Sequence, residues 1–276
     1  MDVRPPAVAG TFYPAEPAVL AGAVDRLLAD ARSGTPAGPA SLAPKALIVP
    51  HAGYVYSGPT AAAAYARLAP VAAALRRVVL FGPAHRVAFR GLALPGVREF
   101  ETPLGAVAID AAGVAAARAL PQVVEAPRAH ALEHSLEVQL PFLQRVLPRF
   151  ALLPFVVGDA SAADVAAVVD ALWGGPETLI VVSSDLSHYH PYQEAQRLDR
   201  ATADAILAAG PALDFDQACG ATPINGLLLA ARRRGLAAEL IDLSNSGDTA
   251  GDRDRVVGYA AFGFHAATAA TAHARH

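Results

Sequence analysis

Short apolar runs of strand length alternate along the chain with longer segments in which apolar residues recur at helical spacing. Several of the short runs are apolar at every position, which is typical of strands covered on both faces. The predicted strands are 46–50, 77–82, 91–94, 151–157, 178–183, 238–243 and 256–264. The predicted helices are 17–32, 60–75, 111–120, 132–147, 162–172, 194–209 and 223–234.

This alternation predicts an α/β fold with a central, mostly parallel (mixed) sheet and helices on both faces. The run 256–264 has no helix after it, so we expect it to close the sheet, in an orientation that the sequence leaves open. The loop-like segment 33–44 follows too few residues to mark a separate core. We therefore predict one domain over residues 1–265 and a disordered, low-complexity tail over 266–276.

Composition narrows the class of protein. Hydrophobic residues make up 54% and charged residues 17% of the 276, which excludes a disordered chain. A net charge of −3 argues against a nucleic-acid or anionic-membrane partner. The apolar runs are shorter than the roughly 20 residues of a membrane-spanning helix. The first ten residues lack the pattern of an export signal, so we expect a cytoplasmic protein.

Three histidines follow predicted strands, and they are the first candidates for chemistry. His51, His85 and His188 come after the strands at 46–50, 77–82 and 178–183. Ligands of open α/β sheets gather at the carboxyl ends of the strands, so the topology would bring these imidazoles together. With a carboxylate, two of them would suit non-haem iron or catalytic zinc. For each histidine taken alone, a surface or hydrogen-bonding role is the commoner one.

Other polar residues near these strands have two interpretations each. His134 and Glu137 share a helix face, which suits either a solvated first turn or a ligand with a supporting carboxylate. Asp185 either caps the next turn or orients a catalytic imidazole. Cys219, the single cysteine, excludes an internal disulfide and a cysteine-cluster metal site. It is either a nucleophile or, more commonly for such a residue, a small buried apolar side chain.

Taken together, the motifs resemble the MEMO family, whose bacterial members are also called AmmeMemoRadiSam system protein B. The resemblance covers nearly the whole chain except its tail, and eight motifs in order make it specific. These motifs are AGTFY (9–13), PHAGYVYSG (50–58), GPAHR (82–86), ETPLG (101–105), EHSLEVQLPF (133–142), SSDLSHY (183–189), CGATPI (219–224) and VVGYAAFGF (256–264).

The resemblance implies a fold similar to that of class III extradiol dioxygenases, which are non-haem iron enzymes. It also implies a metal site in which His51 and His85 are ligands. His188, with Asp185 before it, matches a further active-site histidine, comparable to an acid–base imidazole of the dioxygenases. The residues expected to line or support the site are His134, Glu137 and Tyr54.

The third metal ligand is where this chain departs from the family. Human-type members have a Cys in the segment before the last strand, and this chain has Ser246-Gly247-Asp248-Thr249 there. Counting back from Tyr259 places Thr249 opposite that Cys, with Asp248 adjacent. A carboxylate is a better ligand for Fe(II) than a hydroxyl, so we predict Asp248 as the third ligand, with Thr249 as the alternative.

The function predicted from these residues is that of a metal-binding, dioxygenase-like oxidoreductase that acts on a small-molecule substrate. Fe(II) is the favoured cofactor, with zinc or copper as alternatives. Two other functions stay open: a non-catalytic adaptor that binds a (phospho)peptide or protein in the same cleft, and a zinc-dependent hydrolase. The bacterial family name further implies AMMECR1-type and radical-SAM proteins as partners.

Overall fold

The centre of the fold is a mixed sheet with a parallel core, seen in a computed structural model that describes residues 2–34, 43–210 and 212–266. Its nine strands follow the order β10-β12-β2-β9-β3-β8-β4-β7, and β11 pairs with β12. Neighbouring strands in the middle are parallel: β2 (Ala46–Val49), β9 (Thr178–Ser183), β3 (Arg77–Pro83) and β8 (Ala151–Val157). The predicted mixed α/β sheet is therefore confirmed.

The remaining elements surround this core. The other strands of the large sheet are β4 (Leu92–Leu94), β7 (Val123–Glu125), β10 (His188–His190), β11 (Leu236–Asn245) and β12 (Val256–Ala266). A small separate sheet contains β1 (Val3–Arg4), β5 (Glu99–Thr102) and β6 (Gly105–Ala108). The helices are α1 (Pro17–Gly34), α2 (Tyr54–Ala66), α3 (Ala111–Ala117), α4 (Pro127–Ala131), α5 (His134–Glu137), α6 (Leu140–Val146), α7 (Ala162–Ala171), α8 (Tyr192–Leu207), α9 (Ala221–Arg233) and the 3-10 turn η1 (Ser246–Asp248).

Each of the seven predicted strands is present, and β12 runs antiparallel to both β2 and β11. Two helix predictions differ from the structure. Helix α2 begins at Tyr54 rather than at residue 60 and ends at Ala66. The predicted helix 132–147 is two short helices, α5 and α6, and Pro141 stands in the first turn of α6, where its missing N–H costs nothing. The predicted tail from 267 onward and the loop residues 35–42 lie outside the described residues.

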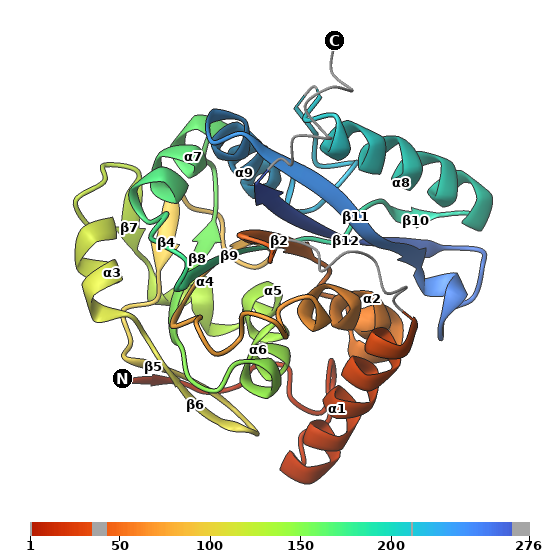
Figure 1. Ribbon diagram of the computed structural model, residues 1–276, viewed down its shortest axis with the longest axis horizontal. Coiled ribbons are helices and arrows are strands. Elements are labelled where there is room, and N and C mark those ends of the chain that lie inside the picture. Colours follow the sequence, from red (N-terminus) through yellow and green to blue (C-terminus); the bar gives the residue numbers. More distant parts are fainter. Residues whose placement is uncertain (1, 35–42, 211, 267–276) are drawn as a thin grey trace.

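Two hydrophobic cores, one on each face of the sheet, explain the continuous apolar runs. Along β2, Leu47 and Val49 pack into the core shared with α1, α2 and α6. Ala46 and Ile48 face the opposite core, which α7, α8 and α9 complete. Figure 1 shows these two groups of helices on opposite sides of the strands. Successive side chains point to opposite faces, so a strand covered on both sides must be apolar at every position.

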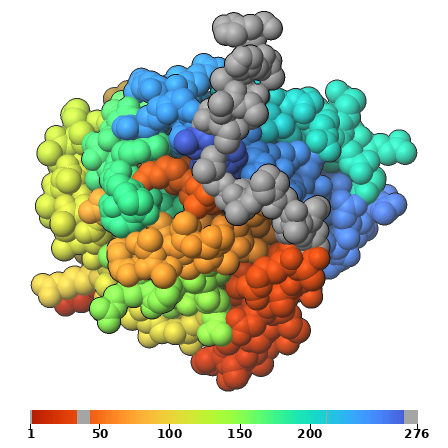
Figure 2. Space-filling view, viewed as in Figure 1, coloured from red at the N-terminus to blue at the C-terminus, as the bar shows by residue number. Residues whose placement is uncertain are grey.

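Helix α1 lies against α2 and closes one side of the first core, which is visible where red and orange surfaces meet in Figure 2. Its inward-facing residues Leu20 and Val24 are fully buried. In the part of the chain that the structure describes, no helix is both long enough and apolar enough to cross a bilayer.

Gly226 allows α9 to approach α7 closely, and its replacement by alanine should destabilise the fold. A Cβ at this position would lie 2.4 Å from the Cβ of Val165. We expect Gly226→Ala to lower the free energy of unfolding by about 1–3 kcal/mol, as overpacked cores do. Gly22 of α1 is the matched control, because a Cβ there meets only the end of the Arg26 side chain at 3.5 Å. Gly22→Ala should be neutral or stabilise by about 0.5–1 kcal/mol, measured by urea unfolding.

Candidate metal centre and its pocket

Three neighbouring parallel strands deliver polar residues to the same edge of the sheet. The chain places His51 just after β2, Asp185 just after β9 and His85 just after β3. Because β9 lies between β2 and β3 and pairs with both in parallel, their carboxyl ends open at one edge. The topology of the sheet therefore brings these three residues together.

A fourth residue, His134 at the start of α5, completes a cluster of three imidazoles. One ligand atom from each of His51, His85 and His134 lies within 4.8 Å of the others. In a tetrahedral site with nitrogen–metal bonds of about 2.1 Å, two ligand nitrogens lie about 3.4 Å apart, so the rings would move inward by about 1 Å to bind one ion. Three imidazoles with this spacing fit a single transition-metal ion.

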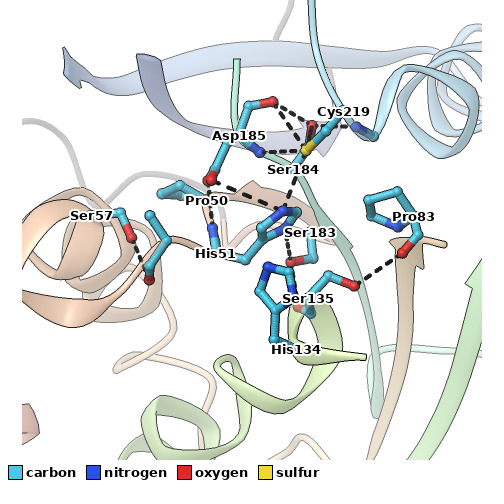
Figure 3. A network of polar contacts seen from close by, with 12 residues as sticks. Pro50, His51, Ser57, Pro83, His134, Ser135, Ser183, Ser184, Asp185 and Cys219 are labelled. Carbon is cyan, nitrogen blue, oxygen red and sulfur yellow. Dashed lines mark hydrogen bonds and ion pairs between the residues drawn. The ribbon is translucent and has the colours of Figure 1, made fainter. Parts of the chain in front are cut away.

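A buried hydrogen-bond network fixes which nitrogen of His51 faces the cluster. The Ser183 hydroxyl donates its only proton to the Ser135 carbonyl at 2.6 Å. Its oxygen must then accept from His51 Nδ1 at 2.9 Å, as it does from Gln139 Nε2 at 2.8 Å. His51 therefore carries its proton on Nδ1 and presents the free Nε2 lone pair to the cavity. Figure 3 shows His51 between Ser183 on one side and Cys219 on the other.

His85 is held by the carboxylate of Glu133. The His85 backbone N–H donates to Glu133 Oε2 at 2.8 Å, and its ring Nδ1 is 2.9 Å from Glu133 Oε1. Although burial favours the neutral acid, the hydrogen bonds from His85 and Ser135 lower the pKa of Glu133 to about 2. The same Oε1 lies 3.5 Å from Nδ1 of His134.

The environment keeps the other two imidazoles neutral at physiological pH. Burial, followed by the proximity of His85 and His134, holds the pKa of His51 well below 6.5. Burial also lowers the pKa of His134 to about 4, although the Glu133 charge opposes this. Metal ligation requires the neutral imidazole, so both residues are ready to bind without losing a proton.

Cys219 and Asp185 lie beside His51 on the side away from His134. The Cys219 Sγ is 3.3 Å from His51 Nε2 and accepts a hydrogen bond from the Asp185 backbone N–H at 3.3 Å. Burial, together with the nearby Asp185, raises the pKa of the Cys219 thiol to about 12. Burial likewise raises the pKa of Asp185 to about 7, while its Oδ1 accepts from the His51 N–H at 2.7 Å. The cavity floor thus contains a thiol and a carboxyl group that titrates near neutrality.

The imidazole cluster lies in a pocket with a volume of about 1160 Å³. His188 also lines this pocket, and burial lowers its pKa below 6.5. Exposed aromatic and charged residues form the rest of its wall, notably Tyr189, Phe215, Arg86 and Arg255. The pocket therefore combines a metal-type donor cluster with space for a small organic molecule.

The structure does not bring Asp248 or Thr249, the residues predicted as third ligand, to the histidines. Asp248 closes a capping box with Asn245, accepting from its N–H at 3.0 Å, and also accepts from the Tyr192 hydroxyl at 2.5 Å. The Thr249 hydroxyl donates to the Tyr56 carbonyl. Both oxygens of Asp248 are thus engaged in a separate, smaller hollow, one by the turn after β11 and the other by Tyr192 at the start of α8. His134 occupies the third position of the cluster instead.

Two residues expected to line or support the site, Tyr54 and Glu137, lie behind it in the core. The Tyr54 hydroxyl donates to the Val138 carbonyl at 2.7 Å, and its neighbour Tyr56 lines the pocket instead. Glu137 is fully buried and accepts from Arg4 at 2.6 Å and from the Tyr13 hydroxyl at 2.5 Å. These two residues hold the N-terminal segment and the helix layer together.

Sequence reasoning left three residues of the centre unassigned: Glu133, Ser183 and Gln139. Their roles depend on contacts across the fold, such as the 48 positions that separate His85 from Glu133. The one available signal was the placement of Glu133 directly before His134 in a shared motif. Cys219 was given two interpretations, and the structure shows it buried against His51 rather than in an apolar core.

Comparison with known proteins gives a consistent family match over the chain. The family described as "Memo-like protein" matches residues 4–263. The chain is 37% identical to a MEMO1 family protein of Aquifex aeolicus over 275 residues, which cover 94% of this chain and 98% of the relative. It is 38% identical to a MEMO1 family protein of Archaeoglobus fulgidus over 280 residues, which cover 95% and 99%. A MEMO1 family protein of Methanosarcina mazei is 36% identical, with coverage of 95% and 98%.

Proposed function

Because the chain belongs to the Memo-like protein family, we propose that its three-imidazole pocket binds one divalent metal ion and acts on a small-molecule substrate as a dioxygenase-like oxidoreductase. The observation that carries this proposal is the cluster of His51, His85 and His134 within 4.8 Å at the base of a pocket of about 1160 Å³. Neutral nitrogen donors around an open cavity are the arrangement that leaves coordination positions for substrate.

The residues around the pocket fit a bound metal ion. His134 Nδ1 is a buried nitrogen with no hydrogen-bond partner, so the cluster contains an unsatisfied polar atom that an ion or a small shift could satisfy. Cys219 Sγ, 3.3 Å from His51 Nε2, is close to the separation of about 3.6 Å expected between sulfur and nitrogen ligands of one tetrahedral ion. Cys219 lies on the far side of His51 from His134, however, so we propose the three histidines alone as ligands.

Iron(II) is the ion we propose, with zinc and copper as the alternatives that the same donors accept. Such an ion would supply a redox-active Lewis acid next to the substrate. The chain itself supplies two groups for proton transfer. Asp185, with a pKa of about 7, and His188, neutral at pH 7, line the pocket and are able to take a proton from a bound hydroxyl group.

Metal analysis of the anaerobically purified protein tests the proposal. We expect close to one iron per chain, and we expect the double variant His51→Ala, His85→Ala to lose it, because two of three ligands are gone. Arg255→Ala, which changes the pocket wall but no donor, is the matched control and should keep the metal. Stoichiometric metal in the double variant would contradict the assigned ligands, and zinc in place of iron would favour hydrolysis.

One observation favours a second candidate, a binding module without turnover. Arg86 lines the pocket and is exposed, and it has no carboxylate partner within the described ranges. An unpaired guanidinium beside neutral imidazoles can bind an anionic group of a peptide or protein. Anion binding that survives metal removal, with no oxygen consumption in the presence of catechols, would favour this candidate over the oxidoreductase.

A further inference from the structure

We propose that Glu133 is the positioning residue of the metal centre, which fixes the ring orientation and tautomer of His85 and supplies the negative charge next to two of the three imidazoles. Its effect on metal binding rests on the proposed function, whereas its effect on His85 does not. No role for Glu133 follows from the sequence pattern beyond that of an acid at the start of a helix.

The Glu133 carboxylate forms a clamp on His85: it holds both the backbone and the ring of that residue. One carboxylate oxygen, Oε2, accepts from the His85 backbone N–H at 2.8 Å, and the other, Oε1, faces ring Nδ1 of the same residue at 2.9 Å. Oε1 also accepts from the Ser135 N–H at 2.9 Å, so the carboxylate caps α5 at the same time. A residue held at both its backbone and its ring has little freedom to rotate.

This clamp determines which nitrogen of His85 is free. Both Glu133 oxygens are acceptors in this arrangement, so ring Nδ1 must carry a proton to bond with Oε1. In the neutral imidazole, the Nε2 atom is then left with its lone pair for an ion. Ser183 imposes the same Nδ1–H form on His51, so two unrelated groups orient two ligands in the same way. Partners of this kind orient metal-binding histidines and raise their basicity.

The charge of Glu133 has no Arg or Lys partner within the described ranges. Arg4 approaches this residue but donates to its backbone carbonyl, and its other end pairs with Glu137. The carboxylate is fully buried, and the titratable side chains beside it are two imidazoles, His85 at 2.9 Å and His134 at 3.5 Å. A buried anion needs a compensating cation, and an ion held by these two rings would be the nearest one.

Nitrogen-15 NMR of the metal-free protein tests the tautomer directly. In the wild type, we expect the His85 ring nitrogens to report a proton on Nδ1 and a free Nε2. Glu133→Ala removes both acceptor oxygens, so neither the ring Nδ1 nor the backbone N–H of His85 keeps its partner. We expect His85 to lose its single tautomer in this variant. His51, held by Ser183, is the internal control and should be unchanged in the same spectrum.

The reciprocal variant sharpens this test. Ser183→Ala removes the acceptor of His51 Nδ1 and should change the His51 signals while leaving those of His85 intact. A wild-type spectrum with the His85 proton on Nε2 would overturn the proposal, and so would an unchanged His85 in Glu133→Ala. If Glu133→Ala fails to fold, the wild-type spectrum alone still decides the tautomer.

Titration with Co(II) measures the consequence for metal binding. We expect Glu133→Ala to weaken Co(II) affinity by about 10- to 100-fold and to change the visible d–d spectrum, because a ligand ring is no longer held in place. Wild-type affinity and spectrum in this variant would overturn the positioning role. A wild type that binds no Co(II) would instead contradict the proposed function, and the NMR result would stand independently.

Discussion

Replacing Arg4 with methionine should lower the free energy of unfolding by about 3–5 kcal/mol, the largest single effect on stability that we expect. The side chains of Arg4 and Glu137 are 4% and 0% exposed, and Arg4 Nη1 is 2.6 Å from Glu137 Oε2. Removing the guanidinium leaves the carboxylate buried without its cation. It also removes donors from the carbonyls of His130 and Glu133, which Arg4 bonds at 2.7 Å each. Urea unfolding followed by circular dichroism measures the change.

The double variant Arg4→Met, Glu137→Gln is the control for this interpretation. If the cost comes from an uncompensated charge, neutralising Glu137 should recover part of the stability lost in Arg4→Met. The amide oxygen introduced by Glu137→Gln is still able to accept from the Tyr13 hydroxyl. A single variant that loses less than about 1 kcal/mol, or a double variant whose losses simply add, would show that the pair is not the anchor of the N-terminal segment.

The second large effect is a pH-dependent gain in stability from Asp185→Asn in the metal-free protein. Burial raises the pKa of Asp185 to about 7 in the fold, against about 3.9 in an unfolded chain. Between these values the folded state holds a proton that the unfolded state has lost, so the contribution of Asp185 to stability falls as pH rises. At about 1.4 kcal/mol for each pKa unit, the wild type should lose on the order of 3 kcal/mol relative to the variant between pH 5 and pH 8.

A comparison with the variant is needed because other groups act in the opposite direction. Burial lowers the pKa of His130 and His134 to about 4, so these histidines destabilise the fold as pH falls below about 6.5. Both histidines are present in the wild type and in Asp185→Asn, so their effects cancel when the two free energies of unfolding are subtracted. Urea unfolding of the wild type and of Asp185→Asn, with a chelator present, gives the difference in their free energies of unfolding at pH 5 and at pH 8. If the stability gained by Asp185→Asn over the wild type does not grow with pH, the raised pKa of Asp185 is contradicted.

The raised pKa of Asp185 matters for proton transfer as well as for stability. A carboxyl group that stays protonated up to about pH 7 is matched to proton exchange at physiological pH. The fold retains it at a cost in stability, which is typical of groups kept for function. Asparagine at this position should therefore give a more stable protein at pH 8 that cannot transfer a proton from this atom.

Some features of the fold were predictable because they depend on short-range physics. A strand buried on both faces must be apolar throughout, so runs such as 178–183 identify the central strands directly. The break of 132–147 into α5 and α6 was harder to predict, since the apolar stripe continues across it while Pro141 starts a new helix. The strands β1, β5 and β6 are too short to show a period of two.

The candidate site, too, was predictable from the sequence in some of its residues and not in others. His51, His85 and Asp185 follow strands, and the parallel neighbours β2, β9 and β3 bring them to one edge by topology alone. His134 was placed near the site only through the family resemblance. Asp248 was predicted as the third ligand from an ungapped count, but its two oxygens accept from Asn245 in the turn after β11 and from Tyr192 of α8.

The sequence by itself determined the α/β class, the central strands and the strand-end histidines, because hydrophobic periodicity and chain order carry that information. Only the tertiary structure decided that His134 joins His51 and His85, that Glu133 and Ser183 orient two of these rings, and that Cys219 faces His51. These contacts join residues 48 to 168 positions apart, and hydrogen-bond geometry at such separations depends on how whole layers pack rather than on any local pattern.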